Sequence, residues 1–133
     1  MFLLDTNVCI HYIRGKNVAI RQRMAAHSAD EIRLCSVVLA ELYVGALSSA
    51  KPAKNRADVD QFAAPFASLT FDDAAADEYA RVRRRLEMMG TPIGPYDMQI
   101  AAIALVNDCT LVTNNTGEFV RVAGLKLEDW QVP

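Results

Sequence analysis

The chain has 133 residues, of which 52% are hydrophobic, and a net charge of −2. This is enough apolar material for the core of one domain, and it argues against binding driven by bulk positive charge. The longest apolar run, Ile100 to Val106, is far shorter than the ~20 residues that cross a bilayer. Asp5 stands where an export signal has basic residues before a long apolar stretch. We therefore expect one soluble, unexported domain over residues 1–133, without membrane attachment.

The first half of the chain alternates short apolar strands with helices. The predicted elements are a strand at 2–5, helices at 6–13 and 18–27, a strand at 32–36 and helices at 37–48 and 52–66. Gly15 ends the first helix, Ser36 is placed to cap the third, and Pro52 opens the fourth.

The second half continues the alternation. A strand at 68–71 leads into Asp72 and Asp73, which suit a helix N-terminus. A long amphipathic helix follows, stopped by Gly90 and Pro92, and then Pro95 opens an apolar helix at 96–106. Strands at 110–113 and near 125–129 complete the pattern. The long helix has Tyr79, Val82, Leu86 and Met89 on one face and Arg81, Arg84 and Arg85 on the other.

This alternation predicts an α/β fold with a mainly parallel central sheet of about four to five strands and helices on both faces. In open parallel sheets, ligands bind beyond the carboxyl ends of the strands, where strand order reverses. Asp5 and residues 113–116 fall at such ends. Glu41 and Asp97 lie in helices that would bring them to the same crevice if those helices flank it.

Asp5, Glu41 and Asp97 each sit beside apolar residues, where an unpartnered carboxylate is costly. Two carboxylates ~4 Å apart repel by about 4 kcal/mol at an effective dielectric near 20, so gathering them favours a bound cation. Oxygen ligands of this kind suit Mg²⁺ or Mn²⁺. Such an ion serves phosphoryl chemistry, and the pattern therefore predicts phosphodiester hydrolysis.

Each acid also has an ordinary structural interpretation. Asp5 could be a turn residue at a strand end, Asp97 a helix cap, and Glu41 one half of a surface salt bridge. The arginines from Arg81 to Arg85 are typical of a solvated helix face, with RNA backbone contact as the alternative.

Other polar and aromatic residues receive structural interpretations. We expect His11 and His27 at the helix surface or the edge of the core, and Trp130 as a cover on the core. The three cysteines, Cys9, Cys35 and Cys109, are scattered and lack the close spacing of zinc ligands. They are interpreted as core thiols in a reducing compartment, which points to the cytoplasm.

Four segments together resemble PIN-domain ribonucleases, specifically the VapC toxins of type II toxin–antitoxin modules. They are Leu4–Val8 (LDTNV), Leu39–Leu42 (LAEL), Ile93–Ala104 (IGPYDMQIAAIA) and Leu111–Phe119 (LVTNNTGEF). The resemblance implies a PIN-like fold and a Mg²⁺-dependent endoribonuclease, with Mn²⁺ as a substitute. The tail from Phe119 to Trp130 also resembles the branch that cleaves initiator tRNA in the anticodon stem-loop, and so implies inhibition of translation.

Carried over by position, Asp5, Glu41 and Asp97 match the family's metal-binding acids, with Asp5 and Asp97 as the best direct ligands. The chain departs from the family at a fourth acidic position after the fourth strand, where its candidates are Asn115 and Glu118. Two threonines beside the acids, Thr6 and Thr113, could orient a carboxylate or the attacking water. Asn7 could do the same or cap the first helix.

The resemblance also implies partners. These are a VapB-type antitoxin that can place a basic side chain near the acids, an RNA substrate, and a second copy of the chain in a homodimer. The apolar helix Val37–Leu47 could supply the homodimer interface. Operator DNA would be contacted only through the antitoxin.

Two alternatives stay open. The segment Leu3–Val8 also resembles the nucleophile motif of aspartate-dependent phosphatases, although Asn7 stands where that family has a second acid. A phosphate trapped covalently on Asp5 would support that interpretation. The other alternative is a module that binds RNA or an antitoxin without catalysis, which would leave RNA intact in Mg²⁺.

Overall fold

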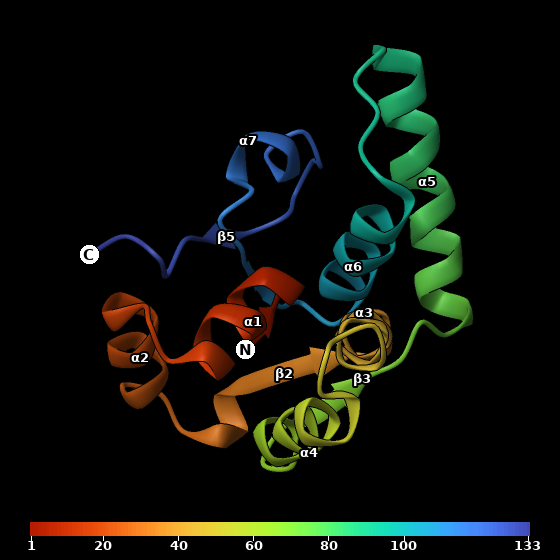
Figure 1. The fold of residues 1–133 in the computed structure, drawn as a ribbon. Coiled ribbons are helices and arrows are strands. Elements are labelled where there is room, and N and C mark those ends of the chain that lie inside the picture. The colour runs from red at the N-terminus through yellow and green to blue at the C-terminus, as the bar shows by residue number, and fades with distance from the viewer.

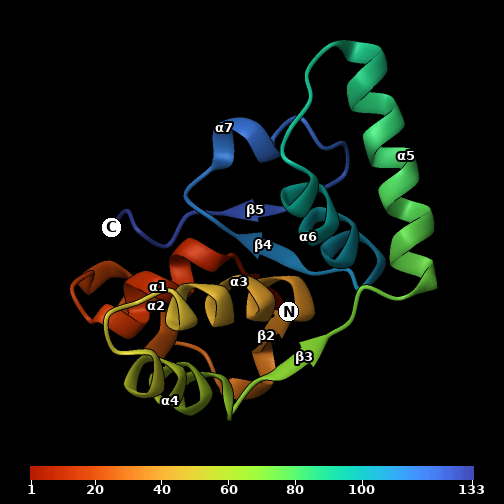
Figure 2. The ribbon, with the colours of Figure 1, turned by 45° about the vertical axis from the view of Figure 1, so that its right-hand side comes forward.

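The computed structural model describes residues 1–133 and contains one parallel sheet (Figures 1 and 2). Its strands have the order β3-β2-β1-β4-β5, and all four neighbouring pairs are parallel. The strands are β1 (Phe2–Leu4), β2 (Ile32–Cys35), β3 (Ala67–Leu69), β4 (Thr110–Val112) and β5 (Leu127–Glu128). The predicted parallel α/β fold is confirmed, with each expected strand within a few residues of its place.

Seven α-helices surround the sheet, and a 3₁₀ turn at Ala29–Glu31 precedes β2. The chain moves from β1 to β3 in one direction and then crosses back to place β4 on the other side of β1. Right-handed crossovers in opposite directions put helices on both faces, as predicted. The helices are α1 (Thr6–Arg14), α2 (Val18–Ala25), α3 (Ser36–Leu47), α4 (Pro52–Ala63), α5 (Asp73–Met89), α6 (Pro95–Val106) and α7 (Thr116–Phe119).

The helix α6 lies deep in the structure because it is apolar on all sides. Its residues from Ile100 to Ala104 have no exposed surface. The amphipathic α5 packs against it through Val82 and Leu86, which are buried as predicted. Met89, expected on the same face, is 58% exposed. The last turn of α5 projects past the start of α6, so Met89 has no neighbour to cover it (Figure 1).

Several helix ends and caps differ from the prediction. Ser36 is the first residue of α3 instead of its cap, and its hydroxyl accepts a hydrogen bond from the backbone N–H of Phe71 at 3.3 Å. The helix α4 ends at Ala63 instead of Phe66, just before Pro65, which has no N–H to continue a helix. Asn7 does not cap α1, because the carboxylate of Asp5 does.

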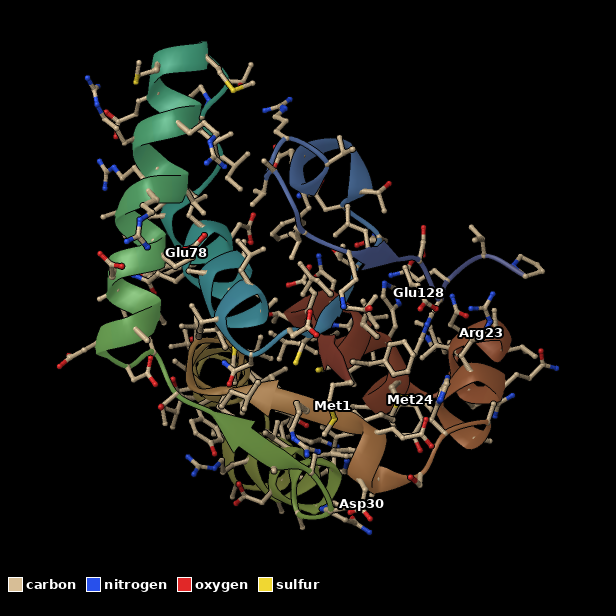
Figure 3. The ribbon with its side chains drawn as sticks, turned by 180° about the vertical axis from the view of Figure 1, so that it is seen from behind. Met1, Arg23, Met24, Asp30, Glu78 and Glu128 are labelled. Carbon is tan, nitrogen blue, oxygen red and sulfur yellow. The ribbon has the colours of Figure 1, made fainter.

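The C-terminal tail is fixed to the body of the protein. Trp130 is fully buried, stacks on His27 with ring centroids 5.3 Å apart and contacts Phe2 at 5.2 Å, which confirms its predicted place over the core. Figure 3 shows Arg23 of α2 beside Glu128 of β5, with 3.9 Å between charged atoms. The three cysteines are free and buried, as expected. No helix combines the length and apolar character needed to cross a membrane.

Candidate functional site

The candidate site lies where strand order reverses, at the adjoining carboxyl ends of β1 and β4. The backbone N–H of Asp5 donates to the carbonyl of Val112 at 2.9 Å, so the ends of the two strands are held together. Asp5 follows β1 and Thr113 follows β4, as the sequence analysis expected of a ligand-binding crevice.

Asp5 is buried, with 6% of its surface exposed, and both carboxylate oxygens are oriented by hydrogen bonds. Oδ1 accepts from the backbone N–H of Thr6 at 2.8 Å, which caps α1, and Oδ2 accepts from the hydroxyl of Thr113 at 2.8 Å. Burial raises the pKa of Asp5, and these two hydrogen bonds oppose the rise. Asp5, for which a turn residue at a strand end was the structural interpretation, instead caps α1 with one oxygen, while the other accepts from Thr113 after β4.

Glu41 reaches the same region from α3. Its Oε1 accepts a hydrogen bond from the hydroxyl of Thr6 at 2.8 Å, and it takes part in no salt bridge. The salt-bridge interpretation of Glu41 is therefore wrong. Because Thr6 donates its N–H to Asp5 and its hydroxyl to Glu41, one residue fixes two carboxylates.

Asp97 lies in the first turn of α6, but its side chain makes no capping hydrogen bond and Gly94 occupies the N-cap position. The cap interpretation of Asp97 is therefore wrong. Burial, followed by the negative charges of Asp5, Glu41 and Glu118, raises the pKa of Asp97 to about 6. Three other carboxylates, from three other segments of the chain, therefore contribute to the raised pKa of Asp97.

The loop after β4 is tied to this region by two hydrogen bonds. The backbone N–H of Asn115 donates to the hydroxyl of Thr113 at 3.0 Å, and its side-chain amide donates to Oε2 of Glu118 at 2.9 Å. The short helix α7, which carries Glu118, was not predicted. Four residues are too few for a periodic signal, although Asn115 before Thr116–Phe119 is a residue type common at helix starts.

The donor set determines what the site could hold. No three histidine, cysteine or acidic side chains are close enough to enclose an ion as a complete protein cage. The carboxylates of Asp5 and Glu41 offer oxygen ligands, and a hard divalent cation that keeps several waters needs only one or two carboxylates. Burial raises the pKa of the nearby Cys35 thiol to about 11. The residues therefore fit a hydrated hard cation.

Comparison with known proteins agrees with this geometry. Residues 2–125 match the PIN domain family. The chain is 40% identical to the tRNA(fMet)-specific endonuclease VapC of Shigella flexneri over 131 residues, covering 97% of both chains. It resembles the crystal structure of DNA-bound VapBC from Salmonella typhimurium with a TM-score of 0.92 and 40% identity, again covering 97% of both chains. It also resembles the crystal structure of DNA-bound VapBC2 from Rickettsia felis, with a TM-score of 0.91 and 34% sequence identity. This match covers 97% of this chain and 98% of that chain.

Proposed function

The chain belongs to the PIN-domain family and, within it, to the VapC toxins, and we propose that it is a Mg²⁺-dependent endoribonuclease that cleaves initiator tRNA. The observation that carries this proposal is the buried carboxylate of Asp5 at the end of β1, which Thr6 links by hydrogen bonds to Glu41; the charges of both acids and of Glu118 help to raise the pKa of Asp97 to about 6. Such mutual repulsion is relieved by a cation, and cation-assisted hydrolysis of phosphodiesters is the chemistry it serves.

The substrate class is supported by sequence likeness along nearly the whole chain. The Shigella flexneri relative is named for its action on tRNA(fMet), and the likeness to it includes 97% of both chains. We propose the same substrate, with cleavage in the anticodon stem-loop and arrest of translation as the consequence.

Asp5 and Asp97 would hold the ion directly, with Glu41 beside them, and Mn²⁺ would substitute for Mg²⁺. When bound, the ion polarises a phosphate oxygen and lowers the pKa of a water that attacks in line. The chain's own residues set the geometry. Thr113 and Thr6 fix the Asp5 carboxylate, and Thr6 holds one oxygen of Glu41 while the other makes no hydrogen bond to the protein.

Asn115 and Glu118 have a supporting place in the proposal. The Asn115 amide holds Oε2 of Glu118, so this carboxylate has a fixed direction, and its charge already acts on Asp97. We propose that Glu118 positions a water or contributes to ion binding from the far side of the site, and that Asn115 orients it.

The proposed partner is a VapB-type antitoxin, as in the VapBC complexes solved for relatives. A groove between α1, α3 and α4 suits its chain, because five apolar side chains and several polar ones, Glu41 among them, line it. A basic antitoxin side chain lying along this groove would reach Glu41, and operator DNA would be bound only by the antitoxin. The lining includes Ile10, Ile13, Leu42, Ala46 and Val59.

Homodimerisation and a cytoplasmic location complete the proposal. Val44 and Leu47 of α3 are 63% and 67% exposed, which is apolar surface that a second copy would cover. The three unpaired, buried thiols suit a reducing compartment, which is also where initiator tRNA acts.

Family membership disfavours the phosphatase alternative. Residues 2–125 match the PIN domain family, and the relatives are named as ribonucleases or endonucleases. The non-catalytic alternative is separated by experiment. The chain would be expressed without an antitoxin as wild type, Asp5→Asn and Asp97→Asn at equal abundance, with the exposed Asp30→Asn as the matched control.

We expect growth arrest and cut initiator tRNA from wild type and Asp30→Asn, and neither from the two site variants. Arrest that persisted in Asp5→Asn or Asp97→Asn with intact tRNA would mean that toxicity does not arise from hydrolysis at this site.

A further inference from the structure

The arginines of α5 fall into two groups. Arg83 donates to Glu87 at 2.9 Å and to the hydroxyl of Tyr79 at 3.1 Å, and Arg81 pairs with Asp77 at 2.6 Å and Glu78 at 3.4 Å. Arg84 and Arg85 have no carboxylate within 4 Å, and both are exposed. Nowhere else in the chain do two consecutive basic residues both lack an acidic partner.

The helical spacing explains why this charge is left uncompensated. Residues three and four positions away are the neighbours of a helical side chain. For Arg85 they are Arg81, Val82, Met88 and Met89, none of them acidic. The only acidic neighbour of Arg84 at this spacing is Glu87, which is already bonded to Arg83.

We call Arg81, Arg84 and Arg85 the arginine face. These three side chains line one shallow surface of α5 together with Asp77, Ala80, Met88 and Met89. Asp77 is the only acid there, and Arg81 engages it. The surface therefore carries more positive than negative charge, although the whole chain is acidic.

The turn of α5 that carries Arg84 and Arg85 lies near the start of α6, which carries Asp97. A separate surface depression is lined by residues of both helices: Arg83, Leu86 and Glu87 of α5, and Pro95 and Met98 of α6. The turn of α5 that contains Arg84 and Arg85 therefore lies beside the turn of α6 that contains Asp97. Packed helix axes are about 8–10 Å apart. Figures 1 and 3 show α5 along one edge of the molecule with side chains projecting outward from it. A nucleic acid held at Asp97 is long enough to reach this edge.

Electrostatics favours such a surface. The acidic site repels a polyanion, and the net charge of −2 adds no general attraction. Cations outside the site therefore add to the affinity for RNA, and unpaired arginines bind phosphate oxygens well because the guanidinium donates two parallel hydrogen bonds. Resting on the proposed ribonuclease function, we propose that the arginine face binds the phosphate backbone of the RNA substrate away from the scissile bond.

The test measures binding of initiator tRNA to full-length protein in EDTA, where no cut occurs, by fluorescence anisotropy between 50 and 200 mM salt. The variants are Arg84→Gln/Arg85→Gln, in which glutamine keeps helix propensity, and the control Lys126→Gln, which removes an exposed base that is paired with Asp108 away from α5. We expect the double variant to bind tRNA more weakly. The slope of log K against the logarithm of salt concentration should fall in magnitude by about 1 to 2, because each lost phosphate contact lowers it by about 0.7–0.9. In Mg²⁺ its KM should rise while kcat stays at the wild-type value.

The outcomes separate this inference from the proposed function. Wild-type affinity and slope in the double variant, with tRNA still cut, would overturn the arginine face and leave the ribonuclease intact. A slope reduction in a protein that cuts no tRNA would support the RNA surface and refute the ribonuclease. If Lys126→Gln lost as much as the double variant, or if the double variant lost only antitoxin binding, the surface would not be an RNA site.

Discussion

The hydroxyl of Thr113 donates a 2.8 Å hydrogen bond to Oδ2 of Asp5, and this contact joins two residues 108 positions apart in the chain. Thr113 itself is fully buried and also accepts from the backbone N–H of Asn115 at 3.0 Å. The end of β4 therefore sets both the direction of the Asp5 carboxylate and the path of the loop that carries Glu118.

Replacing Thr113 by valine should disturb the site without changing its volume. The substitution leaves Oδ2 of buried Asp5 without a donor, which costs about 1–3 kcal/mol of folding free energy. Loss of a partner that orients a ligand typically weakens metal binding by about 10–100-fold. Urea unfolding and Mn²⁺ titration measure the two effects. Thr110→Val, on the same strand and without a side-chain hydrogen bond, should change neither; an equal loss in both variants would refute the positioning role.

The raised pKa of Asp97 predicts a pH-dependent stability of the metal-free protein. Its pKa is about 6 in the folded protein against an ordinary 3.8, so the folded chain holds this proton more tightly than the unfolded chain does. The contribution of Asp97 to the free energy of unfolding is therefore largest below about pH 4 and is lost as the pH rises to about 6. Unfolding in urea with EDTA between pH 4 and 7 measures it.

Asp97→Asn removes this titrating group, so the variant should lack that part of the decline. At pH 7 and without metal, the variant should be at least as stable as the wild-type protein. Its rate of cleavage in Mg²⁺ should nevertheless fall more than about 100-fold. Destabilisation of the metal-free variant at pH 7 would contradict the repulsion inferred among the four acids.

Glu118→Gln should lower the pKa of Asp97, because one of the negative charges that raise it is removed. The glutamine keeps a carbonyl oxygen for the hydrogen bond from Asn115. We expect cleavage to fall by about tenfold, less than for Asp97→Asn. NMR titration of the Asp97 carboxyl carbon and single-turnover cleavage report the two quantities, and an unchanged Asp97 titration would place Glu118 outside the site.

Trp130→Ala should destabilise the whole fold and leave the acids in place. Deletion of a fully buried tryptophan costs about 3–5 kcal/mol, and here it also removes the stacking on His27. Val132→Ala is the control, since Val132 is 52% exposed in the same tail. Thermal unfolding should separate them, and a Trp130→Ala protein as stable as the control would mean that the tail does not hold the core together.

The sequence predicted the sheet because its strands have strong local signals, and the same signals placed Asp5 at a strand end and Asp97 near a helix start. The buried strand before Asp5 and the proline-opened helix of Asp97 each mark their place in the chain. Individual side-chain hydrogen bonds were not predictable. Neither the hydrogen bond from Thr6 to Glu41 nor that from Asn115 to Glu118 leaves a periodic pattern in the sequence. The spacing of Met89 places it on the apolar face of α5. It is nevertheless exposed, because the last turn of α5 projects past the start of α6.

Cleavage of purified initiator tRNA by antitoxin-free protein tests the central claim most directly. The reaction would be run in Mg²⁺, in Mn²⁺ and in EDTA, with Asp97→Asn in parallel, and the RNA ends mapped by sequencing. The account predicts one discrete cut in the anticodon stem-loop with either ion, absent in EDTA and in Asp97→Asn. Intact tRNA under every divalent ion, or the same cut in EDTA, would contradict it.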